Sequence, residues 1–240
     1  MNEEKKFTGK LFLIPTPLTE SFEEGSTGEE IKKVISGLNH FFAENIRTSR
    51  RFISSLKLGI QIEELKFYEL NKDTSESAVE EYIKILKDGN DVGLMSEAGC
   101  PGIADPGSIA VSLAHKEDIQ VVPMIGPSSI LLALMASGFN GQSFVFHGYL
   151  PIDKEQRKAF IRKMEKEAIQ LKRTQIFMET PYRNNSLFED LLRTCEKETL
   201  LCLACDLTSK NEMIRTLPVY KWEKEKTDLN KKPTIFLIYR

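Results

Sequence analysis

The chain has 240 residues, of which 41% are hydrophobic and 28% charged, a composition typical of a globular protein with a sizeable core rather than a disordered one. No apolar run approaches the roughly 20 residues that span a bilayer, and residues 1–6 are polar with no signal-peptide stretch behind them, so we expect a cytoplasmic protein with no membrane partner. The net charge of −2 excludes a globally basic nucleic-acid binder, so any nucleic acid must meet a local patch.

In the first half of the chain, short β-branched and aromatic runs alternate with longer amphipathic segments. This alternation predicts a parallel or mostly parallel sheet covered by helices. The predicted strands are 10–14, 41–44, 65–69, 91–96 and 120–122, and the predicted helices lie near 28–38, 47–57, 75–88 and 106–116. Five strands with four crossovers make one α/β domain, which we place at residues 1–125.

Pro and Gly within residues 123–129 interrupt regular structure and precede an apolar helix, so a second α/β domain is predicted at 126–240. Its predicted helices lie at about 130–137, 153–171 and 184–196, and its predicted strands at 143–147, 175–179, 199–205, 214–219 and 233–239. Only a charged loop or short helix separates the last two strands, so we expect the second sheet to be mixed.

The loop at residues 96–107 follows a buried-looking strand and contains three Gly and two Pro residues. Ligands bind outside the carboxyl ends of strands in open α/β sheets, although an ordinary strand-to-helix loop is the alternative. The loop lacks the P-loop ending and the dinucleotide fingerprint, which disfavours ATP and NAD. Glu97 and Asp105 are available for polar groups of a ligand, or they cap helices, with Asp105 an N-cap before Pro106.

A second loop opens the helix after residue 128. Its free N–H groups and the helix dipole suit an anionic group such as a carboxylate, and a routine N-terminal cap is the alternative. Two Gly/Pro loops at neighbouring strand ends favour a ligand site more strongly than either alone. The residues of this second loop are Gly126, Pro127, Ser128 and Ser129.

Cys202 and Cys205 lie in one predicted strand, where positions three apart point to opposite faces. That geometry is poor for joint metal ligation, so we interpret both as buried structural thiols and expect no metal site.

Basic residues cluster in two places. Arg47, Arg50 and Arg51 lie at a predicted helix start, where cations oppose the helix dipole, which an anionic substrate would explain; a solvated helix face is the alternative. The second cluster, which includes Arg157 and Lys158, is interleaved with Glu residues and is interpreted as a surface helix. His147 is expected to be a satisfied, buried histidine.

Several motifs recur in the order found in one known family. They are residues 13–17, Ala43 and Glu44 with Arg47, residues 96–107, residues 126–128, residues 148–151, residues 179–183 and residues 206–208. By these motifs the chain resembles the tetrapyrrole methylase superfamily and, within it, the small-subunit ribosomal RNA (cytidine-2′-O)-methyltransferase branch.

The resemblance implies a homodimer of two-domain subunits that hold S-adenosylmethionine in the cleft between the domains. The residues that match the family's cofactor site are Ser96, Glu97, Ala98, Gly99, Pro101, Gly102, Gly126, Pro127, Ser128 and Ser129. The candidate substrate contacts are Pro15, Thr16, Arg47, Arg50 and Arg183. Glu44 and Glu179 are candidate general bases, with Arg47 as a further catalytic candidate, and either acid is alternatively an ion-pair partner for Arg47 or Arg183.

The chain departs from the branch pattern at three places. Residues 17–21 read Pro-Leu-Thr-Glu-Ser instead of Pro-Ile-Gly-Asn-Leu, residues 44–47 read Glu-Asn-Ile-Arg instead of Glu-Asp-Thr-Arg, and Glu97 replaces Asp. These departures indicate a divergent paralogue that keeps the cofactor chemistry, while they put the ribosomal RNA target in doubt. We expect RNA ribose 2′-O-methylation or methylation of a related acceptor. A tetrapyrrole methyltransferase and a non-catalytic S-adenosylmethionine sensor are the alternatives.

Overall fold

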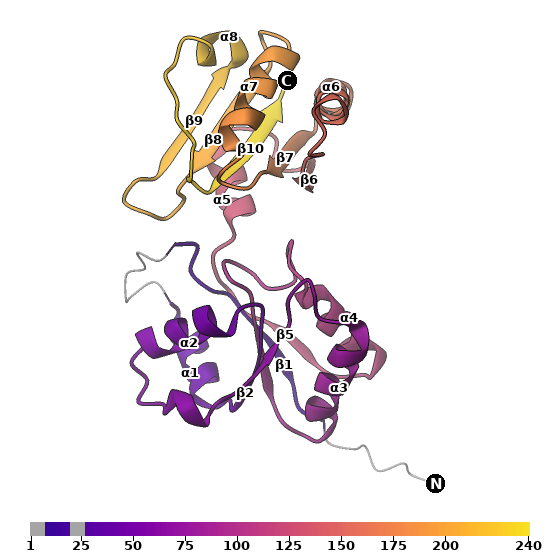
Figure 1. The fold of residues 1–240 in the computed structure, drawn as a ribbon, viewed down its shortest axis with the longest axis vertical. Helices are drawn as coiled ribbons and strands as arrows, with labels where there is room; N and C mark the ends of the chain where they lie inside the picture. Colours follow the sequence, from indigo (N-terminus) through magenta and orange to yellow (C-terminus); the bar gives the residue numbers. More distant parts are fainter. Residues whose placement is uncertain (1–7, 20–26) are drawn as a thin grey trace. The chain divides into compact units, whose positions relative to one another are not determined.

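The computed structural model describes residues 8–19 and 27–240. The polar segment 1–6 and two residues of the altered first motif, Glu20 and Ser21, lie outside the described residues. The chain divides into two units, Met1–Pro127 and Ser128–Arg240 (Figure 1). This division falls two residues after the boundary predicted from the sequence, because Gly126 packs on Pro15 within the first unit.

The first unit is built on a five-stranded sheet whose order is β3-β2-β4-β1-β5, with every pair of neighbouring strands parallel. Its elements are β1 (Leu11–Ile14), α1 (Glu29–Ser36), β2 (His40–Ala43), α2 (Ile46–Ser55), the 3₁₀ helix η1 (Ile62–Glu64), β3 (Lys66–Glu69), α3 (Glu76–Lys87), β4 (Val92–Met95), α4 (Gly107–Lys116) and β5 (Val121–Pro123).

Helices cover both faces of this sheet (Figure 1). Residues of α1 and α2, including Ile35 and Ile53, share one core cluster with Phe41 of β2. Residues of α3 and α4, including Ile83, share a second cluster with Leu94 of β4. All four residues of β4 are buried, as expected for a central strand of a parallel sheet that is covered on both sides. The predicted parallel, helix-covered sheet is confirmed.

The second unit contains a five-stranded mixed sheet with the order β6-β7-β10-β8-β9, in which only β6 and β7 pair in parallel. Its elements are α5 (Ser129–Ser137), β6 (Phe144–Tyr149), α6 (Lys154–Leu171), β7 (Thr174–Met178), α7 (Asn184–Thr194), β8 (Leu200–Cys205), β9 (Met213–Pro218), α8 (Val219–Trp222) and β10 (Thr234–Tyr239). The predicted mixed sheet is confirmed, with α8 as the short helix between its last two strands.

The core of the second unit lies between the sheet and helices α6, α7 and α8, around Trp222 and Phe236. Cys205 belongs to this cluster, whereas the equally buried Cys202 does not, so the two thiols point to opposite faces of β8 as predicted. Helix α5 contacts β8, β9 and β10 without contributing to that cluster, so it covers the other face. Within residues 8–19 and 27–240, no helix is both long and apolar enough to cross a membrane.

Candidate active site

The loops after β1 and β4 are joined by backbone hydrogen bonds in the first unit. The N–H of Thr16 donates to the carbonyl of Gly99 at 2.9 Å, and the N–H of Gly99 donates back to Thr16 at 3.0 Å. The buried Thr16 hydroxyl also donates to the carbonyl of Ser96 at 3.2 Å. Pro15 is buried beside it. The backbone and hydroxyl group of Thr16 therefore fix the two loops to each other, and a substrate contact from Pro15 or Thr16 stays a prediction.

The loop from Ser96 onward turns through two left-handed glycines. Gly99 has φ of +79° and Gly102 has φ of +82°, backbone conformations that side-chain-bearing residues rarely adopt. The Asp105 carboxylate accepts hydrogen bonds from the N–H of Gly102 at 2.8 Å and of Gly107 at 2.7 Å. The backbone of Pro106 is already helical, and the Asp105 carboxylate accepts from the N–H of Gly107, the first residue of α4, so the predicted cap by Asp105 is present and also closes the loop through Gly102.

The predicted second lining segment lies against the first one. A Cβ atom added at Gly126 would be 2.2 Å from Cβ of Pro15, so only glycine fits there. The thiol of Cys100 donates to the carbonyl of Pro127 at 3.4 Å. The two Gly/Pro loops do not follow neighbouring strands as predicted, because β1 lies between β4 and β5, and Pro15 after β1 contacts the second loop together with Cys100. The remaining two residues of the segment, Ser128 and Ser129, begin the second unit, where the hydroxyl of Ser128 caps α5.

Three carboxylates lie near one another at these loops. Glu44 accepts a hydrogen bond from the N–H of Glu97 at 2.8 Å. Burial raises the pKa of Glu44, and the negative charges of Asp105 and Glu97 raise it further, against the opposing effect of that hydrogen bond. No ion pair joins any of the three to a cation among the described residues. The group therefore presents uncompensated negative charge, which attracts a cationic ligand.

Asn45 connects this acidic group to α2 and was not predicted as a site residue. Its side-chain oxygen caps α2 by accepting from the N–H of Thr48, and its side-chain nitrogen donates to Glu97 at 2.8 Å. Two of the departures from the family pattern, Asn45 and Glu97, are thus in direct contact. An Asn immediately before a predicted helix is an N-cap signal that could have identified the first of these roles.

The arginines of α2 lie on its exposed surface. Arg47 is in the first turn, but Arg50 and Arg51 are in the second, so the prediction that all three oppose the dipole at the helix start is wrong for those two. Arg50 lies over the ring of Phe67 at 5.1 Å. Neither Arg47 nor Arg50 forms an ion pair within the described part of the chain.

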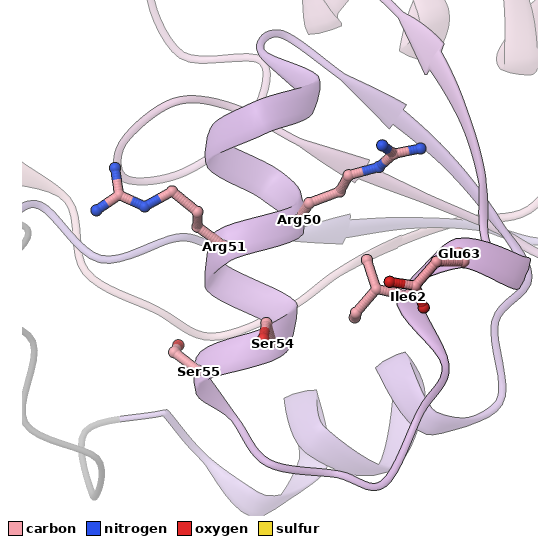
Figure 2. Close-up of a pocket in the computed structure, with 6 residues that line it drawn as sticks. All are labelled: Arg50, Arg51, Ser54, Ser55, Ile62 and Glu63. Atoms are coloured by element: carbon pink, nitrogen blue, oxygen red, sulfur yellow. The ribbon is translucent and has the colours of Figure 1, made fainter.

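An open pocket of about 480 Å³ lies along α2 and η1 (Figure 2). Arg50 and Arg51 extend from opposite sides of the helix, and the serines lie one turn further on. Its lining residues are Arg50, Arg51, Ser54, Ser55, Ile62 and Glu63. The guanidinium groups are hydrogen-bond donors for phosphate or carboxylate oxygens, whereas the Ser55 hydroxyl already donates to the carbonyl of Phe52 and Glu63 adds a negative charge. The arginines are therefore the part of the pocket that suits an anionic group.

In the second unit, Glu179 directly follows β7 and forms the ion pair that was one of its two predicted roles. Its Oε1 accepts from the N–H of Thr180 at 2.7 Å and from Arg183 at 2.6 Å. The Glu179 side chain is 1% exposed and that of Arg183 is 38% exposed. Three buried atoms at this turn, Oε2 of Glu179, Nε of Arg183 and Oδ1 of Asn184, have no hydrogen-bond partner among the described residues. The turn is therefore polar inside and incompletely satisfied.

Two other sequence interpretations can be compared with the structure. His147 is half-buried and its Nε2 lies 2.7 Å from the side-chain oxygen of Gln175, which confirms a satisfied histidine. Helix α6 carries local ion pairs such as Lys158 with Glu155, as expected for a surface helix. The assignment of Arg157 to that surface is wrong, because it is buried in an ion pair with Asp190 at 2.5 Å.

The family model of the Tetrapyrrole (Corrin/Porphyrin) Methylases matches residues 33–222. The chain belongs to this family. This tetrapyrrole methylase is 30% identical to Ribosomal RNA small subunit methyltransferase I of Buchnera aphidicola subsp. Schizaphis graminum, over 96% of the chain and 78% of that relative. The protein of the same name from Vibrio cholerae is 27% identical over 95% of the chain and 76% of its own length.

Solved structures share the fold of this tetrapyrrole methylase. The methyltransferase CobJ matches with a TM-score of 0.66 at 15% identity, covering 97% of this chain and 95% of its own. Diphthine synthase matches with a TM-score of 0.69 at 13% identity, covering 96% and 90%. Uroporphyrin-III C-methyltransferase of Thermus thermophilus, complexed with S-adenosylhomocysteine, matches with a TM-score of 0.57 at 13% identity, covering 97% and 98%. The names of these proteins indicate different methyl acceptors, so the shared fold does not identify the acceptor of this chain.

The predicted family, fold class and cofactor are confirmed, and this tetrapyrrole methylase is an S-adenosylmethionine-dependent methyltransferase. The first unit fits that methyl donor chemically, because the donor carries a cationic sulfonium and an ammonium group while Glu44, Glu97 and Asp105 form no ion pair with a cation of residues 8–19 or 27–240. The glycine-rich loops add exposed backbone at Ala98 and Gly126. Among the described residues, no group of three or more His, Cys, Asp and Glu side chains is placed to hold a metal ion.

Proposed function

We propose that this enzyme methylates RNA of the small ribosomal subunit, at a ribose 2′-hydroxyl group. The observation that carries the proposal is the similarity over 96% of the chain to proteins named Ribosomal RNA small subunit methyltransferase I. The arginine-lined pocket along α2 supports an anionic acceptor, because guanidinium groups pair readily with phosphate oxygens. As a part of the same proposal, the enzyme acts in the cytoplasm as a homodimer.

The methyl donor is proposed to lie against the joined loops of the first unit. Its predicted contacts are Ser96, Glu97, Ala98, Gly99, Pro101, Gly102, Gly126 and Pro127, followed by Ser128 and Ser129 of the next segment. The donor supplies a methyl group on a positively charged sulfur. The chain contributes orientation of the acceptor oxygen, since placing two reactants at near-attack distance is the main requirement of such a transfer. The bonds between Thr16 and Gly99 keep the loops in place for this task.

Glu44 is the proposed general base, which accepts the proton of the hydroxyl group. It is half-buried, no cation neutralises it among the described residues, and its raised pKa brings it closer to the range of an effective base. Glu179 is less suited, because its side chain is nearly inaccessible and its Oε1 already accepts hydrogen bonds from Arg183 and Thr180. Arg47 and Arg50 are proposed to bind phosphate groups of the acceptor.

A tetrapyrrole is the second candidate acceptor. The specific observation in its favour is that Arg47 and Arg50 are exposed cations without acidic partners in the described chain, and carboxylate side chains of a tetrapyrrole would pair with them as phosphates do. The two candidates differ in salt dependence. Binding through several RNA phosphates weakens steeply with salt, whereas a small anion held by one or two arginines gives a shallow slope.

The test is transfer of a labelled methyl group from S-adenosylmethionine to small ribosomal subunits from a strain that lacks this gene, with a tetrapyrrole precursor in parallel. Label in RNA that Arg47→Ala lowers about tenfold or more supports the proposal, since a hydrogen bond to a charged group contributes about 1.5–3 kcal/mol. Arg193→Ala is the matched control, because Arg193 is an exposed arginine of α7 paired with Glu189. Label only in the tetrapyrrole contradicts the proposal, and tight donor binding with label in neither favours a sensor.

A further inference from the structure

Two tyrosines are exposed at one end of the second sheet. Tyr149, at the end of β6, is 57% exposed, and Tyr182, in the turn after β7, is 76% exposed. The parallel register pairs Tyr149 with Met178, the last residue of β7, so both tyrosines follow the carboxyl ends of adjacent strands. Ligands of α/β sheets bind at such ends. Two large aromatic side chains exposed at the same end of a sheet are typical of a surface that binds another molecule.

Two lysines lie against the same turn. The N–H of Lys231 donates to the carbonyl of Pro181 at 3.0 Å, and the side chain of Asn184 donates to the carbonyl of Lys232 at 2.7 Å. These bonds hold the segment before β10 beside Tyr182. Both lysines are exposed, and neither forms an ion pair with any residue in 8–19 or 27–240. Positive charge and aromatic surface are thus side by side.

The segment that follows Tyr149 is held in place by a buried arginine. The register of β6 against β7 shifts between Phe146 and Tyr149, and a bulge of this kind redirects the side chain that follows it. The buried Arg157 donates to the carbonyl of Ile152 at 3.0 Å, while its pairing with Asp190 fixes the guanidinium. The exposed ring of Tyr149 therefore lies at the end of a strand whose following segment is fixed.

The turn that carries Tyr182 is fixed by the ion pair between Glu179 and Arg183, which spans it. Two exposed aromatic rings next to lysines that form no ion pair with another described residue match the chemistry of single-stranded nucleic acid, whose bases stack on aromatic side chains while its phosphates pair with cations. A wholly apolar protein partner would not use the two lysines. The combination of charges and rings therefore favours RNA.

We propose that Tyr149 and Tyr182 stack against unpaired bases of the RNA substrate while Lys231 and Lys232 contact its phosphates. The inference rests on the proposed RNA methyltransferase function and specifies which structure of RNA the enzyme accepts. A single strand or an opened loop satisfies the tyrosines, because its bases can leave their stack, whereas a continuous A-form duplex keeps its bases inside.

The experiment measures methyl transfer to small ribosomal subunits by the full chain, and its binding to a fluorescent oligouridine and to an RNA duplex. Tyr149→Ala and Tyr182→Ala are each expected to raise KM for the subunit and Kd for oligouridine about fivefold or more, since stacking is worth about 1–3 kcal/mol per base. The Tyr→Phe variants keep the ring and should stay within about twofold of the wild type. Affinity for S-adenosylmethionine and kcat at saturating RNA should not change.

Phe144→Ala is the matched control, because Phe144 is an exposed aromatic residue at the opposite end of β6. The double variant Lys231→Ala with Lys232→Ala should reduce the slope of log affinity against log salt by about 1.4, about 0.7 for each phosphate contact with a single strand. Thermal melting of every variant shows whether the fold is retained.

The outcomes separate the inference from the function on which it rests. If the wild type methylates RNA and the tyrosine variants match it, the stacking inference is wrong and the proposed function stands. If the wild type transfers no label to RNA, both are overturned. If the alanine variants dissociate a dimer while affinity for oligouridine is unchanged, the surface is an interface between copies and the inference is again overturned.

Discussion

Replacing Gly126 by alanine tests whether binding of the methyl donor depends on the contact between the second loop and Pro15. The added Cβ atom would lie 2.2 Å from Cβ and 2.6 Å from Cγ of Pro15, whereas ordinary contacts begin at 3.4 Å. The second loop and Pro15 must therefore separate by about 1.2 Å. Overpacking of this kind costs about 1–3 kcal/mol in stability, and a misplacement of about 1 Å in an enzyme site can cost about a hundredfold in rate.

The assay is calorimetric titration with S-adenosylhomocysteine alongside urea unfolding. We expect Gly126→Ala to remain folded and to lose most of its affinity, while Gly141→Ala, where nothing lies within 4 Å of the added atom, behaves as wild type. Adding Pro15→Gly to Gly126→Ala removes the colliding atoms and should restore part of the affinity. Affinity of Gly126→Ala within twofold of the wild type would refute the assignment of this segment to the cofactor site.

Two further substitutions test how the charged groups of Glu44 and Arg157 affect the free energy of unfolding. Because burial raises the folded-state pKa of Glu44 above its ordinary value of 4.5, the stability that this group contributes is fully present below the unfolded-state pKa and is lost as the pH rises through the folded-state pKa. In urea unfolding, Glu44→Gln should therefore gain stability relative to the wild type as the pH rises from below 4.5 through the raised folded-state pKa of Glu44, and a pH-independent difference would contradict this. Arg157→Ala leaves Asp190 buried without its partner, so the free energy of unfolding should fall by about 3–5 kcal/mol, while Arg157→Met with Asp190→Leu should be milder; equal losses in both variants would argue against the ion pair as the cause.

The sequence predicted the architecture well because each strand of the first sheet is a short apolar run between amphipathic segments. The end of β4 and its glycine loop were recognisable for the same reason. The buried position of Arg157 could not be predicted, because its acidic partner Asp190 lies 33 residues away on another helix. The local charge pattern contains no information about that pairing. The contact of Asn45 with Glu97 spans 52 residues and was missed for the same cause.

The two exposed tyrosines, Tyr149 and Tyr182, show the same limit. The sequence motif around Gly148 and the one around Glu179 were both noted, but the pattern does not say that their strands are neighbours or that a bulge precedes Tyr149. Likewise, Lys231 and Lys232 read as part of a charged segment until backbone bonds placed them beside Pro181 and Asn184. Strand order, which arises from long-range pairing, is what brings chemically related residues together.

The position of β10 in the second sheet has a consequence for how the protein is made. This strand, Thr234–Tyr239, lies between β7 and β8, so the middle of the sheet is supplied by residues synthesised after all of its other strands. The first unit closes earlier, since its central strands β4 and β1 are both complete by Met95. During translation the first unit can fold while the second waits with β7 and β8 unjoined, and their exposed edges are then open to wrong pairing or to a chaperone.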